Sequence, residues 1–316
     1  MKEGKEVKEV QEVKEAEESN PGIAAFFDLD GTLMSLPSLE RRFFRMLRYR
    51  QEIPLKNYFL WLVEALRLLP RGFRVISQAN KMYLQGVRSF DESGAENFDD
   101  FSAHQSGRPC FIRASQAGGQ ESATPSTSER RNPRCLVPHF FEEAVERVAW
   151  HAEQGHLIAI LSGTLEPLGK IAAQALEGEL AACGIAAKIC VRATCLEESR
   201  GRFTGRVLGD AVFGAAKAQA AKQMAAEMRL NLGNSFAYGD SANDLRLLAA
   251  VGNPAAVNPS RRLLRVARKR SWRVLRWNEE KELTQSPQRT RRRTRLETRK
   301  RKAEQRFVAA GRHTNV

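Results

Sequence analysis

Apolar residues gather in short runs along the middle of the chain, with polar residues between them. Nearly continuous apolar runs occur at 23–27, 157–161, 189–191 and 235–238. Runs of this length are typical of strands that are buried on both faces of a parallel sheet. Residues 140–151 instead repeat apolar positions at helical spacing. This alternation predicts an α/β fold with a Rossmann-like parallel sheet core.

Two further elements follow the fourth predicted strand. Pro259 and Ser260 are suited to the start of a helix that runs to Arg268. Residues 272–277 then predict a late strand, so the core extends to about residue 280.

Three segments lack this pattern and divide the chain into domains. Residues 1–20 are almost entirely charged, and 93–134 is rich in Ser, Gly, Gln and Pro without periodicity. Both compositions predict disorder. Residues 281–316 form a basic, polar tail with little to bury, which we also expect to be disordered. The remaining residues make up the predicted core, 21–34 and 155–280, and an insertion between its two parts, 35–154.

Charge and cysteine content narrow the class of protein. The formal net charge is +14, but twelve Lys and Arg stand against three Glu in 281–316, so most of the basicity lies in the tail. Such a tail, above all 289–302, makes non-specific contact with polyanions possible. No apolar stretch reaches the ~20 residues that cross a bilayer, and the charged N-terminus does not resemble a signal peptide. Because the five cysteines lack metal-ligand spacing, we expect a cytoplasmic protein without a membrane span.

Two aspartates, Asp28 and Asp30, leave the end of the first predicted strand, and Gly31 follows them. Two carboxylates this close repel each other and lose hydration when buried. A divalent cation such as Mg²⁺ removes both costs, and open α/β sheets bind ligands at the carboxyl ends of their strands. The alternative is an acidic turn without a metal.

The second and fourth predicted strands also end in polar residues. Ser162, Gly163 and Thr164 offer a hydroxyl and free backbone N–H groups, which suit an anion at a strand-to-helix turn. Asp240 and Asp244 follow the fourth strand, where Asp240 can reach a metal and Asp244 can orient it or its water. Ordinary turn chemistry and a helix N-cap are the alternatives at these two places.

A basic partner for these acids is expected in the Ala-rich helix at 215–228. Both Lys217 and Lys222 lie in it. Lys217 is in the first turn, nearer the predicted strand ends, so we favour Lys217; most lysines on such helices are simply solvated.

Together these motifs resemble the haloacid dehalogenase-like phosphatases. The nucleophile motif is Asp28-Leu29-Asp30-Gly31-Thr32, the phosphate-binding serine is Ser162 and the lysine is Lys217. The last motif, Gly239-Asp240-Ser241-Ala242-Asn243-Asp244, is similar to that of the phosphoserine-phosphatase-like branch.

The same resemblance implies a helical cap inserted after the first strand, which fits the long gap between Asp28 and Ser162. Residues 40–69 and 72–83 are helix-like and suited to this cap. The segments 40–45 and 80–86 look like those of an uncharacterised bacterial set within the branch. Residues 203–206 are similar to its substrate-proximal hairpin.

The resemblance also implies a mechanism. Asp28 forms an aspartyl-phosphate while Asp30 acts as acid and then as base. Mg²⁺ is held by Asp28, the backbone carbonyl of Asp30 and Asp240, with Asp244 beside them. An Asp at the position of Asp30 favours a phosphatase over a phosphonatase or a dehalogenase. The residues expected to hold phosphate are Thr32, Ser162, Gly163, Lys217 and Asn243.

The expected substrate is a small phosphorylated metabolite, and no obligate protein partner is evident. Free phosphoserine is not expected to lead, because Ser35-Leu36-Pro37-Ser38 has no acid where the resemblance calls for a partner of the substrate ammonium. Glu40 could take that place in a different helix phase. Nearby Arg41, Arg42 and Arg45 indicate tolerance of anionic substrates. Two other functions remain open, a phosphotransferase using the same intermediate and a nucleic-acid or anionic-surface binding protein.

Overall fold

The computed structural model describes residues 21–90 and 138–277. The charged N-terminus, the 93–134 segment and the basic tail with its 289–302 stretch lie outside these residues. The predictions made for them therefore stay predictions.

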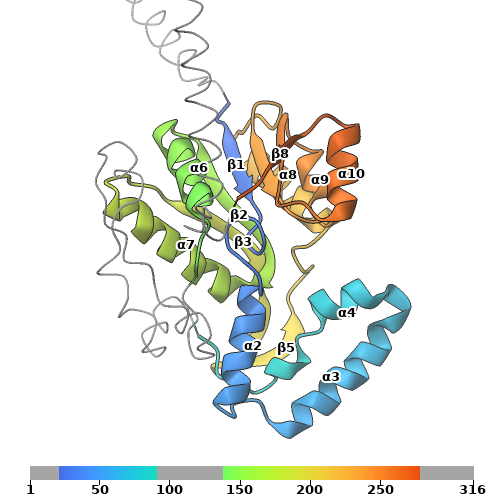
Figure 1. Cartoon of the computed structure of the whole chain (residues 1–316). Helices are drawn as coiled ribbons and strands as arrows, with labels where there is room; N and C mark the ends of the chain where they lie inside the picture. The colour runs from blue at the N-terminus through green and yellow to red at the C-terminus, as the bar shows by residue number, and fades with distance from the viewer. Residues whose placement is uncertain (1–20, 91–137, 278–316) are drawn as a thin grey trace, which may run out of the picture. The chain divides into compact units, whose positions relative to one another are not determined.

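A parallel sheet with strand order β3-β2-β1-β6-β7-β8 forms the core (Figure 1). Every neighbouring pair in this sheet is parallel, which confirms the Rossmann-like α/β fold. The strands are β1 (Ala24–Phe27), β2 (Leu157–Leu165), β3 (Ile189–Thr194), β6 (Phe236–Gly239), β7 (Asn253–Val257) and β8 (Arg273–Leu275).

Helices cover both faces of this sheet. One buried cluster joins α6 and α7 to one face, and a second joins α8, α9 and α10 to the other. The alternating side chains of β1 explain this division, because Phe27 packs in the first cluster and Phe26 in the second. Both rings are fully buried, and burial of each contributes about 2–3 kcal/mol. The helices are α6 (Glu142–Glu153), α7 (Glu166–Ala182), α8 (Ala215–Glu227), α9 (Leu245–Leu248) and α10 (Arg261–Lys269).

The helical cap predicted after the first strand is also present. It consists of α2 (Leu39–Tyr49), α3 (Leu55–Leu68), η1 (Leu69–Arg71), α4 (Phe73–Ala79) and η2 (Met82–Leu84).

A two-stranded hairpin from the second half of the chain joins this cap. It is formed by β4 (Leu196–Ser199) and β5 (Arg202–Val207). The Gly86 N–H donates to the Phe203 carbonyl at 2.8 Å, and the Phe203 N–H donates to Val87 at 2.9 Å. The hairpin, which the predicted boundaries placed in the core, thus extends the cap.

Two expectations about boundaries need correction. β2 does not end at Leu161 but continues to Leu165, with a register irregularity against β3, and α7 begins only at Glu166. The segment 162–164, which we expected to bind an anion at a strand-to-helix turn, therefore lies in an irregular strand rather than at a helix N-terminus. Helix α6 packs on β2, so it belongs with the sheet although the predicted insertion ran to residue 154.

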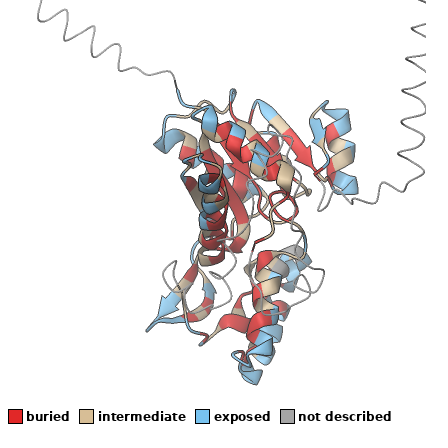
Figure 2. Cartoon of the chain, turned by 60° about the vertical axis from the view of Figure 1, so that its left-hand side comes forward, coloured by how far each residue is buried: buried red, intermediate tan, exposed pale blue. Residues whose placement is uncertain are grey.

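The outer part of the cap is packed less tightly than the sheet. Between α3 and α4 only a small cluster of Ala65, Leu68 and Ile76 is buried, whereas the central strands β1, β2 and β6 are buried almost throughout (Figure 2). Large apolar side chains on the same helices are exposed, including Leu55, Phe59, Leu62, Leu66 and Phe73.

No helix within the described ranges is long and apolar enough to cross a membrane. Cys190 and Cys195 are free thiols, whereas Cys183 is disulfide-bonded. A disulfide does not favour the reducing compartment expected from the cysteine spacing, and the cytoplasmic location stays a prediction.

Candidate active site

The two aspartates of the first motif line one pocket at the end of β1. Asp28 is buried, and its Oδ1 accepts the Leu29 N–H at 2.8 Å. Asp30 reaches toward the cap, where its Oδ1 accepts the N–H of Leu39, the first residue of α2, at 2.8 Å. Burial raises the pKa of Asp30, and the Leu39 N–H opposes the shift. One carboxylate therefore stays at the strand end, and the other links the strand to the cap.

Gly31 lets the chain turn sharply between these elements. Its φ is +86°, and a Cβ atom at this position would lie 2.6 Å from Oδ2 of Asp240. Only glycine combines this backbone conformation with so close an approach.

Lys217, in the first turn of α8, joins the acids of two strands. Its Nζ lies 2.6 Å from Oδ1 of Asp28 and 2.7 Å from Oδ1 of Asp244. Burial acts to lower the pKa of Lys217, but Asp244 and Asp28 outweigh it and raise that pKa above its ordinary value. Burial raises the pKa of Asp28 well above its usual range, while Lys217 opposes the shift. The alternative lysine, Lys222, is exposed on the same helix.

The acids that follow β6 occupy different environments. Asp244 is fully buried, and its Oδ2 accepts the Ser241 N–H at 3.0 Å and the Ser241 hydroxyl at 2.9 Å. Gly239 leaves room for it, since a Cβ there would meet the Cβ of Asp244 at 2.5 Å. Asp240 faces the pocket, and burial together with the charge of Asp244 raises its pKa to about 7.

These carboxylates suit a divalent cation. One oxygen each from Asp28, Asp240 and Asp244 lies within 4.8 Å of the others. Lys217 pairs with two of these carboxylates, Asp28 and Asp244, so the three carboxylates and Lys217 together carry a formal charge of −2 when ionised. Hard carboxylate oxygens are the ligands that Mg²⁺ prefers. The donor set and its uncompensated charge therefore fit Mg²⁺.

The irregular last part of β2, the neighbour of β1, contributes hydroxyl and backbone groups. Ser162 is buried, lines the pocket and accepts the Thr164 N–H at 3.2 Å. Gly163 also lines it, and a Cβ there would lie 2.7 Å from Oε1 of Gln78 on α4. The missing side chain of Gly163 thus lets the cap approach the expected phosphate site.

Most other predicted residues gather in the same place. Asn243 lines the pocket beside Ser241. Thr32 does not line it; its side chain is fully buried, and Oγ1 has no hydrogen-bond partner among the described residues. Its role in phosphate binding stays a prediction, as do the individual roles of the other residues.

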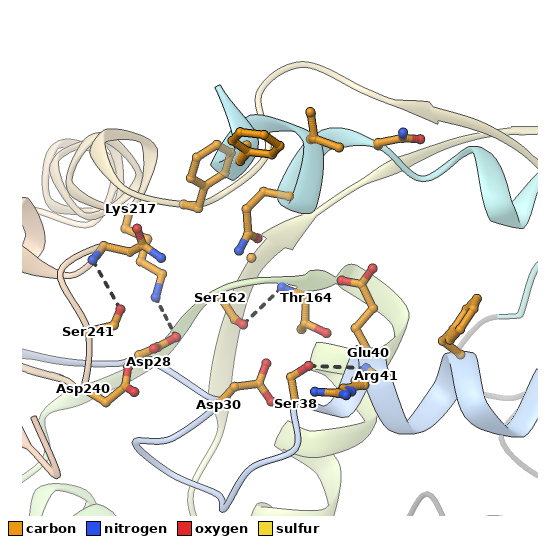
Figure 3. Close-up of a pocket in the computed structure, with 18 of the residues that line it drawn as sticks. Asp28, Asp30, Ser38, Glu40, Arg41, Ser162, Thr164, Lys217, Asp240 and Ser241 are labelled. Carbon is orange, nitrogen blue, oxygen red and sulfur yellow. Dashed lines mark hydrogen bonds and ion pairs between the residues drawn. The ribbon is translucent and has the colours of Figure 1, made fainter. Parts of the chain in front are cut away.

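The pocket has a volume of about 810 Å³ and is shared by the sheet and the cap. In Figure 3, Asp28, Asp240 and Lys217 lie at one end, and Glu40 and Arg41 lie on α2 at the other. Sequence reasoning left Glu40 open and did not find the cap residues that line the pocket without any motif: Phe44, Trp61, Phe73, Ile76 and Gln78. Phe213, before α8, was missed as well. No local signal marks them, because their shared surface exists only after the cap folds over the sheet.

Several known proteins are similar to this chain. The phosphoserine phosphatase SerB1 of Mycobacterium tuberculosis is 28% identical over 251 residues, which cover 79% of this chain and 70% of that protein. A protein of Streptomyces azureus named for inhibition of morphological differentiation is 32% identical over 144 residues, 44% of this chain and 47% of that protein. A solved structure of a Bordetella pertussis protein of unknown function has a TM-score of 0.49 and 26% identity, and the match covers 81% of this chain and 99% of that chain.

The family model for haloacid dehalogenase-like hydrolases matches residues 25–249. This match runs from β1 and the two aspartates that follow it, through the cap and Lys217, to the acids after β6. The resemblance seen in the four motifs is thereby confirmed: the chain belongs to the haloacid dehalogenase-like hydrolases.

Proposed function

We propose that this hydrolase cleaves small phosphomonoesters with the help of Mg²⁺, through an aspartyl-phosphate on Asp28. The observation that supports it most is the buried contact of Lys217 with both Asp28 and Asp244 at a strand end that opens into the pocket. The relative named phosphoserine phosphatase and a second M. tuberculosis relative named probable phosphatase agree with this activity.

Asp28 is oriented for attack by its own neighbours. The interactions described for its carboxylate, from Lys217 and from the Leu29 N–H, both involve Oδ1. Oδ2 is then the oxygen that faces the phosphorus atom and forms the new bond, while the bond from phosphorus to the leaving oxygen breaks. Lys217 opposes the rise in the pKa of Asp28 that burial causes, which favours the ionised nucleophile, and it offers a positive charge to the phosphoryl oxygens.

Asp30 is suited to the proton transfers. Burial raises the pKa of Asp30, which favours the protonated carboxyl group, and this group gives its proton to the leaving alkoxide. In the second half of the reaction the resulting carboxylate takes a proton from the water that attacks the phosphoryl group on Asp28. The hydrogen bond from Leu39 holds Asp30 between the nucleophile and the cap.

Asp28 and Asp240, together with the backbone carbonyl of Asp30, are the groups proposed to hold Mg²⁺. When bound, the ion neutralises charge on the phosphoryl oxygens and orients them. Asp244 positions Lys217 and the Ser241 segment around this site. Ser162, Gly163 and Asn243 are placed around the remaining phosphoryl oxygens, with the Ser162 hydroxyl as a donor.

Transfer to an alcohol uses the same intermediate, so a phosphotransferase is the second candidate. It differs only in the acceptor that attacks phosphorus in the second step. Incubation with excess glycerol and detection of glycerol phosphate separates transfer from hydrolysis. Binding of nucleic acid through 289–302 is supported by composition alone, so we rank it below both enzymatic functions.

The test is release of phosphate from 4-nitrophenyl phosphate by the wild type and by Asp28→Asn. The substitution keeps the shape of the side chain but removes the nucleophilic charge, so activity should fall to background. Wild-type activity should also be lost with EDTA and return with Mg²⁺. Full turnover by Asp28→Asn, or turnover that EDTA does not affect, contradicts the proposal.

A further inference from the structure

The first turn of α2 lies opposite Asp28, Asp240 and Lys217 in the pocket, and it begins beside Asp30, whose Oδ1 accepts the Leu39 N–H. Ser38, Glu40 and Arg41 line the pocket there (Figure 3). The leaving group of a bound phosphomonoester extends from the catalytic end toward this turn. The charges of the turn therefore decide what kind of leaving group fits.

The negative charge of Glu40 is already matched inside the cap. Lys81 Nζ lies 2.5 Å from Oε1 and 2.7 Å from Oε2 of Glu40, and the Tyr83 hydroxyl donates to Oε1 at 2.7 Å. Lys81 is only 1% exposed, so Glu40 is its means of balancing a buried charge. Glu40 therefore faces the pocket without offering a free negative charge to a substrate ammonium.

The three arginines of α2 differ in what they do. Arg42 donates from Nε to the Pro37 carbonyl and from Nη2 to the Ser35 carbonyl, both at 3.0 Å, and so braces the loop before the helix. Arg45 is exposed and does not line the pocket. Arg41 does line it, and within the described residues it forms no ion pair.

The pocket that Arg41 lines also has apolar walls. Trp61, Phe73 and Phe44 line the pocket from the cap side. Such walls exclude water when a substrate fills the pocket, which strengthens an ion pair formed there. A guanidinium group also presents a planar fork of donors that matches a carboxylate or a phosphate.

We propose that the natural substrate carries a second anionic group, a carboxylate or a phosphate, and that Arg41 binds it. This inference rests on the proposed phosphatase function and narrows its substrate class to phosphorylated acids and bisphosphates. The charge balance of the first turn carries the argument. Once Lys81 has neutralised Glu40, the charge left at this end of the pocket is the positive charge of Arg41.

The experiment compares matched alkyl phosphates that differ only at their far end. The far end carries a methyl, an ammonium, a carboxylate or a phosphate group. Linkers of two to four methylenes are compared to find the length at which this group reaches Arg41. At the best length, kcat/KM for the carboxylate or phosphate compound should exceed that for the methyl compound at least tenfold, and the ammonium compound should rank last. The anionic compound with the higher kcat/KM shows whether the second group of the substrate is a carboxylate or a phosphate.

Two variants test the role of Arg41 itself. Arg41→Gln should reduce the ratio of kcat/KM between the anionic and the methyl compound to less than about threefold. Arg45→Gln removes the same charge from the same helix outside the pocket, and this control should keep the wild-type ratio. A wild type without preference for either anionic compound at any length overturns the proposal. Equal ratios in Arg41→Gln and Arg45→Gln do the same.

Lys81→Met provides an independent readout, because it frees the charge of Glu40. The ammonium compound should then gain at least tenfold in kcat/KM relative to the methyl compound. If this variant does not fold, Glu40→Gln replaces it, and preference for the anionic compounds should rise. A ratio that stays unchanged in the folded variant contradicts the charge balance. Failure of the phosphatase function is recognised separately, since the methyl compounds would then be hydrolysed no faster by the wild type than by Asp28→Asn.

Discussion

The two ends of the pocket are built in different ways. At the sheet, Asp28, Lys217 and Asp244 are buried and bound to one another. At the cap, Arg41 and Phe73 are exposed, and the lining comes from helix surfaces rather than strand ends. A buried, mutually paired group tolerates little change, because loss of one partner leaves the other charged and unsatisfied. The exposed cap lining can vary without this cost, so the sheet suits a fixed chemistry and the cap suits the choice of substrate.

The packing beneath the two ends differs in the same sense. The sheet lies between two large buried clusters, whereas α3 and α4 share one small cluster. Polar contacts hold α3 to the rest of the cap: Asn57 Nδ2 donates to the Tyr83 carbonyl at 3.0 Å and to Gln85 at 2.7 Å. The outer cap is therefore expected to open more readily than the sheet.

The largest expected effect comes from breaking the paired group at the sheet. Lys217→Met should lower kcat/KM for 4-nitrophenyl phosphate by about 10²–10³-fold, because a positive charge that stabilises the phosphoryl group is lost. Lys222→Met, on the exposed side of the same helix, is the control and should match the wild type. Thermal melting of both variants shows whether the loss comes from unfolding. A folded Lys217→Met with normal kinetics would remove Lys217 from the mechanism.

The difference in packing can be measured by amide hydrogen exchange. Amides in the middle of α3 should exchange at least about a hundredfold faster than those of β1, relative to their intrinsic rates. The reason is the small amount of buried apolar surface that opening of α3 and α4 exposes. Equal protection of the two regions would mean that the cap and the sheet open as one unit.

Adding a single Cβ atom at Gly31 tests how tightly the residues at the sheet end of the pocket are packed. Gly31→Ala should lower kcat/KM about 10–100-fold, since the new atom displaces the Asp240 carboxylate from a position set within fractions of an ångström. Gly155→Ala is the matched control: its φ of +69° imposes similar strain, but nothing lies within 4 Å of the added atom. Similar kinetics in the two variants would show that the contact with Asp240 has no importance.

The smallest expected effect is on the free energy of unfolding, through a histidine buried beside the sheet. His151 is fully buried, and its Nε2 lies 2.9 Å from the Tyr238 hydroxyl. Burial, assisted by the charges of His156 and Arg147, lowers its pKa from 6.5 to about 3. Between pH 6.5 and pH 3 this histidine is protonated in the unfolded chain but neutral in the folded chain. Its contribution to the free energy of unfolding is therefore full above pH 6.5 and is lost as the pH falls toward 3.

At pH 5 this loss should reach about 2 kcal/mol, at about 1.4 kcal/mol per pH unit. Urea denaturation at pH 7 and pH 5 measures it, and His151→Gln should reduce the difference between the two. The same pH dependence in the variant would mean that other groups are responsible.

Strands β1, β2, β3 and β6 were predictable from sequence because each contains a nearly continuous apolar run. β7 (Asn253–Val257) was not predicted, because it is short and begins with Asn253 and Pro254. Asp28, Ser162 and Asp240 could be placed together because parallel strands bring their carboxyl ends to one edge. The end of β2 was predicted too early, since the irregular pairing of 162–165 with β3 leaves no periodic pattern. The cap lining could not be predicted, because exposed aromatic residues such as Trp61 and Phe73 resemble any helix surface until it is known that the cap and the sheet share one pocket.

The central place of β1 also bears on how the chain folds during synthesis. Ala24 pairs with Leu157 and Ala25 with Phe236, while the Ala24 N–H donates to Ser235 Oγ across 211 residues. Contacts so distant in sequence form slowly, because a long loop must be closed before they can contribute. A nascent chain that ends before Phe236 exposes an unpaired edge of β1, which other chains can pair with. The strand that leads to Asp28 is thus made before the other strands of the sheet but gains its second neighbour only when β6 leaves the ribosome, and until then its open edge is a place for chaperones to protect.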